Sequence, residues 1–297
     1  MSSERPSIDR DALERLVREV VRDTLTVSEI GPRSAPAEVC EDGCTPRNAA
    51  RQVPIDPHEA RRVVDATPAR VVQGRTGTRY LTPTYLQLRA EHAIALDAVH
   101  SSVPAGWPEQ HGLIALKSRC RDLAEHLLYP DHGRRLDDES RERLAQQADR
   151  GVDVQIIAGD GLAAHALLLQ GAELVAALKA ELKQVGLSFG KPLFVRHARI
   201  GVQDEIGALT GAKSTLVIVG ERPGLGTGDS LSIYTAFRPR LGQDNSEKNC
   251  ISNIRPLGMP PAAAARECAR LLRRTFDAGG GGIHLVRPRR DVVVHGG

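Results

Sequence analysis

The sequence predicts an α/β protein whose largest domain is a Rossmann-like, mostly parallel sheet. From about residue 119 onward, strand-like runs alternate with helical patterns, and this alternation favours a parallel sheet covered on both faces. One run, residues 215–220, is short, continuous and β-branched, which is typical of a strand buried on both faces. A hydrophobic content of 41% and a mean hydropathy of −0.28 are sufficient for a globular core.

The expected elements follow one another through this domain. Gly186 marks the end of one helix, and the prolines at 260–261 mark the start of another. The strand-like runs cover residues 152–158, 192–196, 215–220, 230–237 and 251–254, of which 230–237 alternates as a half-exposed strand does. The helical patterns cover residues 162–184 and 203–209, and a last one extends from 260 to the glycines that begin at 279.

Two smaller regions precede the sheet domain. Residues 9–25 carry Leu and Val at helical spacing, which predicts an amphipathic helix, and the proline-containing stretch that follows is typical of a flexible linker. We therefore expect a helix and linker over 1–57, a small helical region over 58–118 and the Rossmann-like domain over 119–297. Within the second region, Thr82 and Pro83 are expected to start a helix that ends near His100.

The amphipathic helix at 9–25 leaves two interpretations open. Because one such helix cannot bury its own apolar stripe, it docks either on its own protein or on another one.

Charge and composition exclude several functions and compartments. Forty Lys and Arg against 37 Asp and Glu give a net charge of +3, which is not typical of a dedicated nucleic-acid-binding protein. There is no apolar stretch long enough to span a membrane, and the N-terminus lacks the apolar core of a secretory signal. Five widely spaced cysteines argue against a disulfide framework and for the reducing cytoplasm.

Three loops are the candidate ligand-binding edge. In parallel sheets, ligands bind beyond the carboxyl ends of the strands, which here are followed by Gly159–Gly161, the segment after Arg196, and Gly220–Gly226. Glycines after a buried strand allow a bulky ligand to approach the backbone. Glu221 stands at one strand end, where it is either a functional carboxylate or an ordinary solvated one.

The familiar motifs are weak or misplaced. Residues 207–214 resemble a phosphate-binding loop, but they follow a helix and precede a strand, so a helix-to-strand turn is the better interpretation. The glycines at 220–228 do not form a dinucleotide-binding fingerprint. Cys40 and Cys44 lack two further zinc ligands, and Cys250, in an expected polar turn, is interpreted as a small apolar loop residue. No self-contained catalytic set is present, which favours a chain that holds a ligand while another component performs the chemistry.

Two strings are more specific than these motifs. Residues 219–226 read Val-Gly-Glu-Arg-Pro-Gly-Leu-Gly, and residues 250–254 read Cys-Ile-Ser-Asn-Ile. With residues 74–79, 88–93, 97–99, 159–162, 194–196, 204–207 and 230–232, they resemble the small (light) subunit of ethanolamine ammonia-lyase. The resemblance extends from about residue 70 to about residue 285.

The resemblance implies a subunit of an adenosylcobalamin-dependent lyase that converts ethanolamine to acetaldehyde and ammonia. A large TIM-barrel subunit would bind the substrate, and the corrin would lie between the subunits. The family's cofactor contacts fall on Ile200, Glu221 and Cys250, with no catalytic residue and no protein metal site in this chain. The resemblance also implies that residues 9–25 package the enzyme into a bacterial microcompartment within the cytoplasm.

The resemblance also implies base-on binding of the cobalamin. The sequence agrees with this mode, since it lacks the D-x-H-x-x-G string that supplies a histidine to cobalt in base-off domains. The alternative function is a stand-alone Rossmann-type protein that binds a nucleotide or phosphate. It predicts a proper glycine fingerprint, which we do not find. A purely structural scaffold would leave the glycine-lined edge unexplained.

Overall fold

The computed structural model describes residues 56–67 and 69–286, which belong to two compact units, 1–80 and 81–297. The predicted helix at 9–25, most of its linker with Cys40 and Cys44, and the tail after residue 286 lie outside the described residues. The three-part division at 57/58 and 118/119 stays a prediction.

The described part of the first unit consists of a short helix and a two-stranded hairpin. Its elements are α2 (Pro57–Asp65), β1 (Arg75–Thr76) and β2 (Arg79–Tyr80). The carboxylate of Asp56 caps α2 by accepting the backbone N–H of His58 at 2.9 Å, and Arg61 pairs with Asp65 one turn along. Of the residues up to Tyr80 whose burial the structure describes, none is buried, so these residues do not form a core of their own.

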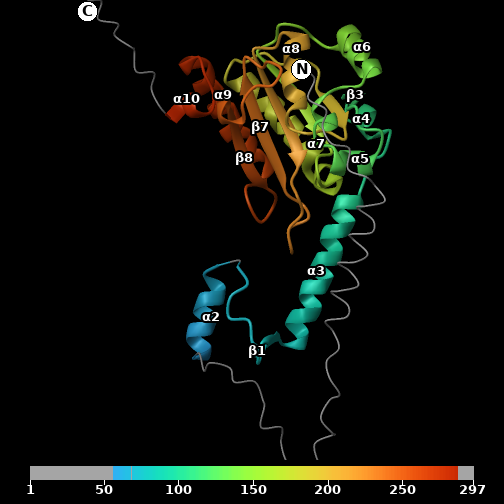
Figure 1. Cartoon of the computed structure of the whole chain (residues 1–297). Helices are drawn as coiled ribbons and strands as arrows, with labels where there is room; N and C mark the ends of the chain where they lie inside the picture. Colours follow the sequence, from blue (N-terminus) through green and yellow to red (C-terminus); the bar gives the residue numbers. More distant parts are fainter. Residues whose placement is uncertain (1–55, 68, 287–297) are drawn as a thin grey trace, which may run out of the picture. The chain divides into compact units, whose positions relative to one another are not determined.

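The second unit is built on a six-stranded sheet with the strand order β3-β5-β4-β6-β7-β8 (Figure 1). Strands β3, β5, β4 and β6 are parallel, and β7 and β8 extend the sheet in antiparallel fashion. The strands are β3 (Ile114–Lys117), β4 (Val154–Gly159), β5 (Leu193–Arg196), β6 (Ser214–Gly220), β7 (Leu231–Phe237) and β8 (Lys248–Ile254). The structure confirms the α/β class and the mostly parallel sheet that the sequence predicts.

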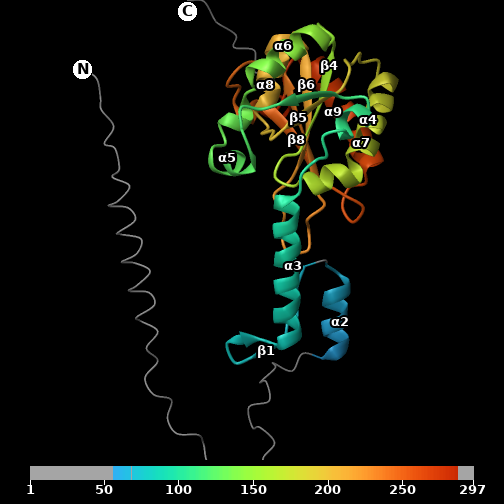
Figure 2. The same ribbon diagram turned by 90° about the vertical axis from the view of Figure 1, so that its right-hand side faces the viewer.

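Helices cover both faces of this sheet (Figures 1 and 2). Helices α7 (Ala164–Gln184) and α9 (Pro261–Ala278) pack on one face over the larger hydrophobic cluster. Helices α6 (Asp138–Gln147) and α8 (Val202–Thr210) pack on the other face over a second cluster. Neighbouring residues of β4 point to opposite faces, so Ile156 enters the first cluster and Ile157 the second. The continuous apolar runs in the sequence follow from this burial on both faces.

The remaining elements connect and flank these layers. They are α3 (Thr82–His100), α4 (Trp107–Gln110), α5 (Leu123–Leu128), α10 (Ile283–Val286) and the short 3-10 helices η1 (His132–Arg134) and η2 (Asn245–Glu247).

Most expected elements lie where the sequence predicts them, and four details differ. The segment 114–117, predicted only as part of a small helical region, forms the edge strand β3. Helix α3 is preceded by Leu81 as its N-cap, because Thr82 is already helical. Strand β7 is mostly buried rather than half-exposed, since it lies between β6 and β8. Cys250 belongs to strand β8 and not to a turn, because its segment pairs with β7.

Helix α3 belongs to the second unit and contacts the rest of that unit mainly through its C-terminal end. Ala98 is its only buried residue. Just beyond the helix, the Ser101 hydroxyl donates to the Ala98 carbonyl at 2.6 Å and accepts the backbone N–H of His165 at 2.9 Å. Large apolar side chains along the helix remain exposed, namely Tyr85, Leu86, Ile94 and Leu96. A helix of this length with so little buried surface is marginal without further contacts.

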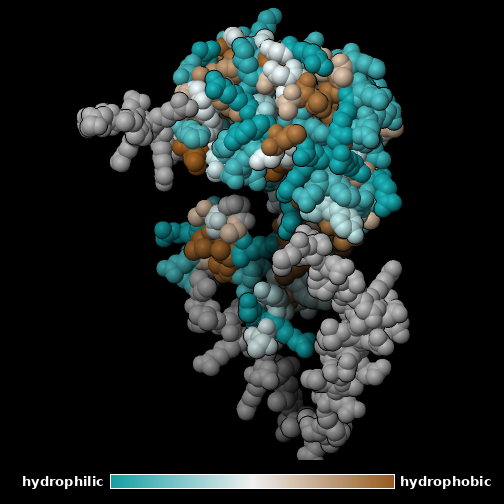
Figure 3. Space-filling view, turned by 45° about the horizontal axis from the view of Figure 1, so that its top comes forward, coloured by the Kyte–Doolittle hydropathy of each residue, from teal (hydrophilic) through white to brown (hydrophobic). Residues whose placement is uncertain are grey.

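On the face drawn in Figure 3, hydrophobic residues lie in separate patches among hydrophilic ones. Within the described ranges, none of the helices combines the length and the apolar character needed to cross a bilayer.

Two glycines bring the strand ends β4 and β6 into close contact. Gly161, just after β4, has a φ of +60°, and a Cβ atom placed there would lie 2.5 Å from the carbonyl oxygen of Gly220. The backbone N–H of Leu162 donates to the same oxygen at 3.0 Å. The floor of the sheet edge is therefore made of backbone, with no room for a side chain.

We expect Gly161→Ala to destabilise the protein far more than Gly151→Ala. Gly151 has a similar φ of +67°, but a Cβ atom placed there would meet nothing within 4 Å, so its replacement costs about 1–2 kcal/mol for the left-handed backbone alone. Gly161→Ala adds a clash with rigid backbone, for a further loss of roughly 2 kcal/mol or more. Urea unfolding of both variants measures the difference, and equal losses would contradict the close packing.

Candidate functional site

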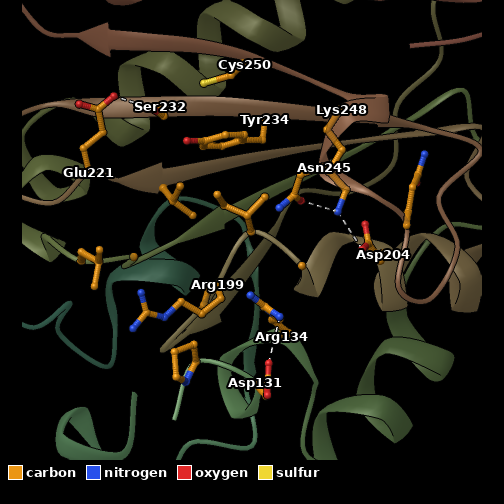
Figure 4. Close-up of a pocket in the computed structure, with 18 of the residues that line it drawn as sticks. Asp131, Arg134, Arg199, Asp204, Glu221, Ser232, Tyr234, Asn245, Lys248 and Cys250 are labelled. Atoms are coloured by element: carbon orange, nitrogen blue, oxygen red, sulfur yellow. Dashed lines mark hydrogen bonds and ion pairs between the residues drawn. The ribbon is translucent and has the colours of Figure 1, made fainter. Parts of the chain in front are cut away.

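A cavity of about 830 Å³ opens at the carboxyl ends of the parallel strands (Figure 4). The loops after β4, β5 and β6 all contribute to its lining, as the sequence predicts for a ligand-binding edge. Further lining comes from strands β7 and β8, from the segment 241–245, and from Pro130, Asp131, Arg134, Arg135 and Asp204. The volume lies within the range of small-molecule sites.

The cavity has two contrasting walls. In Figure 4, Ser232, Tyr234 and Cys250 project from strands β7 and β8 on one side, with Glu221 beside them, whereas Arg199 and Arg134 stand on the other. Gly161 and Val219 contribute the backbone and apolar surface at the strand ends. A ligand between these walls meets hydroxyl and carboxylate groups on one side and guanidinium groups on the other.

Glu221 follows β6 directly, and its carboxylate is held by groups from strands β7 and β8. The Ser232 hydroxyl of β7 donates a short hydrogen bond to its Oε1 atom, and the backbone N–H of Asn253 in β8 donates to the same atom at 3.1 Å. Among the described residues, Oε2 has no hydrogen-bond partner. One oxygen thus fixes the carboxylate while the other remains an acceptor for a ligand.

A bulge in the sheet brings Asn253 into this position. Leu231 pairs with Ile254 and Ile233 with Ile251, so Ser252 and Asn253 together face the single residue Ser232. Asn253 has a φ of +56°, a conformation that asparagine tolerates better than most residues. Bulges of this kind redirect groups at the edges of functional sites, and here the bulge aims a backbone N–H at Glu221.

Cys250 lies opposite Tyr234 on the adjacent strand and lines the same wall. Although the residue as a whole is exposed, packing around its thiol raises the pKa of the Cys250 side chain. Burial also raises the pKa of Tyr234 to about 12. Both groups therefore remain protonated near neutral pH, and Cys250 is a neutral polar contact rather than a thiolate nucleophile.

Ile200 lies on the loop between β5 and α8. It lines the cavity and packs, half-buried, against the second hydrophobic cluster. The structure thus brings the three predicted cofactor contacts, Ile200, Glu221 and Cys250, to one cavity from three separate elements. That they bind a cofactor stays a prediction.

A buried ion pair closes the far end of the cavity. Lys248 of β8 donates to the carboxylate of Asp204 in α8 at 2.9 Å, and both side chains are almost fully buried. Lys248 also approaches Asn245 at 3.4 Å. Burial raises the pKa of Asp204, and the contact with Lys248 opposes that shift. Because removal of one partner would leave a buried charge, the pair fixes the relative position of α8 and β8.

Asp160 anchors the loop that carries Ile200. Its buried carboxylate accepts the backbone N–H groups of His197 at 2.8 Å and Ala198 at 3.0 Å. His126, fully buried, completes the junction through a 2.9 Å hydrogen bond from its ring to the Gly161 carbonyl. Sequence reasoning missed this anchor, although an aspartate between two glycines after a buried strand is a recognisable signal.

The groups around this anchor have strongly shifted pKa values. Burial raises the pKa of Asp160 to about 6, although the two backbone N–H groups and Arg196 oppose the shift. Burial, and the repulsion from Arg196, Lys117 and, once protonated, His126, lower the pKa of His197 to about 4. Both histidines at the junction are therefore neutral near pH 7.

The loop between β4 and α7 also corrects one sequence-based conclusion. Residues 159–164 read Gly-Asp-Gly-Leu-Ala-Ala, which has the G-x-G-x-x-A spacing of a dinucleotide-binding turn between a strand and a helix. The helix N-terminus is already occupied by the chain itself, since the N–H of Leu162 bonds to the Gly220 carbonyl and that of His165 to the Ser101 hydroxyl. The fingerprint is present in spacing, but these amide groups are not free for a phosphate.

No cluster of three or more metal-binding side chains occurs among residues 56–67 and 69–286.

The sequence matches a known protein family. The family model of the ethanolamine ammonia-lyase light chain (EutC) matches residues 57–286, about three quarters of the sequence. The matched region includes every element described above and all of the cavity.

We expect His197→Asn to change how stability depends on pH. Since the pKa of His197 falls from 6.5 to about 4 on folding, its contribution is complete above pH 6.5 and is lost as the pH falls toward 4. The raised pKa of Asp160 acts in the opposite direction but is present in both proteins. Asparagine tolerates the φ of +56° at this position.

The free-energy difference between wild type and variant should therefore shift in favour of the variant between pH 7 and pH 4, by up to about 3 kcal/mol. Urea unfolding at several pH values measures it. A difference that is constant over this range would mean that His197 is not held neutral.

Proposed function

Because the chain belongs to the ethanolamine ammonia-lyase light-chain family, we propose that its cavity holds the corrin of adenosylcobalamin against the large subunit. Membership makes the chain the light subunit of an ammonia-lyase complex, which has a large partner subunit and a cobalamin cofactor. The proposal rests on one observation, that Ile200, Glu221 and Cys250 all line the same cavity.

The chemistry of the cavity suits a corrin. A corrin has an apolar macrocycle surrounded by amide side arms, so it needs both apolar surface and hydrogen-bond acceptors. Ile200 and Val219 supply apolar surface, and Oε2 of Glu221 is an acceptor for an amide N–H. The neutral thiol of Cys250 offers a weak polar contact on the same wall.

The residues of this chain bind and orient the cofactor and keep water away from it. When bound, adenosylcobalamin supplies the radical chemistry by which ethanolamine becomes acetaldehyde and ammonia. Asp160 and His126, which contact the backbone beside the cavity floor, are committed to hydrogen bonds with that backbone. Substrate binding and turnover accordingly belong to the large subunit, for which we propose a TIM barrel.

Two features of the chain support a partner protein of this kind. Helix α3 exposes Tyr85, Leu86, Ile94 and Leu96, and the described residues up to Tyr80 include no buried one. Exposed apolar side chains of this number on one helix are typical of a surface that another chain covers. The proposal extends to packaging in a microcompartment through residues 9–25, which lie outside the described part of the chain.

A stand-alone nucleotide-binding protein is the second candidate, and the G-x-G-x-x-A spacing at 159–164 is the observation that favours it. The engaged amide groups of Leu162 and His165 argue against it. Tight binding of ATP or NAD by the chain without a large subunit would support this candidate.

We expect Glu221→Gln and Glu221→Ala to weaken retention of cobalamin by the light–large complex about tenfold or more. The glutamine keeps an oxygen for Ser232 and Asn253 but presents N–H groups where the ligand needs an acceptor, and a charged hydrogen bond contributes about 1.5–3 kcal/mol. Equilibrium dialysis with cyanocobalamin measures the affinity.

Glu173→Ala, on the exposed face of α7, is the matched control and should bind cyanocobalamin as the wild type does. Thermal unfolding establishes that the variants remain folded. Unchanged affinity in folded Glu221 variants would remove this residue from the site.

A further inference from the structure

Arg134 and Arg199 stand near each other on the cavity wall opposite Glu221 (Figure 4). Arg134 belongs to η1, and Arg199 to the loop between β5 and α8. Arg222, at the third strand end, also lines the cavity, and its charge contributes to lowering the pKa of Arg199. Three arginines from three segments thus line the same cavity.

The two segments that carry Arg134 and Arg199 interlock through glycines. A Cβ atom at Gly133 would lie 2.5 Å from Cγ of Arg199, and one at Gly201 would lie 3.0 Å from Cγ of Arg134. Each arginine therefore packs against the glycine next to the other. The backbone N–H of Arg199 donates to the Gly133 carbonyl at 2.8 Å, so the like charges are held in place by the backbone.

Within the described part of the chain, only Arg134 among these three arginines has an ion-pair partner. Arg199 forms no ion pair there, and its Nε atom is buried without a hydrogen-bond partner, although Nη2 donates to the His126 carbonyl at 2.6 Å. Arg134 pairs only with Asp131, whose side chain is 87% exposed. Burial, together with the repulsion from Arg134 and Arg222, lowers the pKa of Arg199.

Such an arrangement costs free energy unless an anion occupies it. Like charges held close together repel one another, and a buried N–H without a partner costs about 1–3 kcal/mol. A planar guanidinium presents N–H groups in a fork that matches the oxygens of a phosphate. The carboxylate of Glu221 is fixed on the opposite wall by Ser232 and Asn253, so it does not serve as the counter-charge.

We propose that Arg199, together with Arg134 and Arg222, forms an anion subsite that binds the phosphodiester of the cobalamin nucleotide tail. This inference rests on the proposed function, because that function supplies the ligand. The amide arms of the corrin are neutral, whereas the phosphodiester carries a full negative charge. The two walls then bind different parts of the cobalamin. Glu221 accepts a hydrogen bond from an amide arm of the corrin, and the arginines bind the phosphodiester of the nucleotide tail.

The test compares two corrins that differ in the tail. Cyanocobalamin carries the phosphodiester, and dicyanocobinamide has the same corrin without the nucleotide. Dissociation constants of both are measured by equilibrium dialysis with the light–large complex, for wild type, Arg199→Gln and Arg222→Gln. Arg150→Gln is the matched control, because Arg150 is exposed and does not line the cavity.

We expect the wild type to bind cyanocobalamin more tightly than dicyanocobinamide. Arg199→Gln should weaken cyanocobalamin roughly ten- to a hundredfold and leave dicyanocobinamide unchanged, since only the first has the anion. Arg222→Gln, an exposed change that does not disturb packing, should show a smaller loss with the same selectivity. Arg150→Gln should change neither dissociation constant.

Equal losses for both corrins would make Arg199 a structural residue and overturn the subsite. The subsite would also be overturned if inorganic phosphate bound the cyanocobalamin-loaded complex as tightly as the unloaded complex. The phosphodiester would then not occupy the site at which phosphate binds. Phosphate that competes with cyanocobalamin but not with dicyanocobinamide would support the proposal. If the wild-type complex binds neither corrin, the proposed function itself fails.

Discussion

The carboxylate of Asp160 is the contact on which the geometry of the cavity depends. Asp160 directly follows β4. Its carboxylate accepts two consecutive backbone N–H groups, those of His197 and Ala198, just after β5. The loop fixed in this way carries Arg199 and Ile200 and leads into α8. Because the carboxylate is buried, its two hydrogen bonds must offset a large desolvation cost, and a replacement that cannot accept both would release the loop. One side chain thus positions both an apolar contact and a guanidinium.

Close packing of backbone explains why this anchor is needed. Gly161 and Gly220 approach so tightly that no side chain fits between the ends of β4 and β6. The floor of the cavity is therefore rigid backbone without polar side chains, and the polar side chains of the site come from the walls. The antiparallel strands β7 and β8 provide one side, where the bulge at Asn253 directs a backbone N–H at Glu221. The loops after β5 and η1 provide the other side, so the carboxylate and the arginines are kept apart.

The sequence predicts the strands and helices of this fold well because burial on both faces leaves a direct signal. Strands β4 and β6 are continuous apolar runs, and three glycine-containing or polar loops follow the parallel strands. Strand β3 escaped prediction because four residues are too few to establish a period. Only the second half of β8, residues 251–254, is predicted as a strand, and Cys250 is assigned to a turn because its polar segment gains its conformation from pairing with β7. The contacts Asp160–His197 and Glu221–Asn253 join segments that are distant in the sequence. Strand order and register determine these contacts, and local sequence patterns do not contain that information.

The polar groups near the cavity are arranged for holding rather than for reaction. A general base or nucleophile must be free to exchange a proton with a substrate, and its pKa must suit that exchange. Here Cys250 and Tyr234 remain protonated, His126 binds a backbone carbonyl, and Asp160 is occupied by two N–H groups. What remains available is an acceptor on Glu221 and donors on the arginines, which are fixed in place before a ligand arrives. Such pre-organisation lowers the cost of binding a ligand, which agrees with the proposal that this chain holds a cofactor.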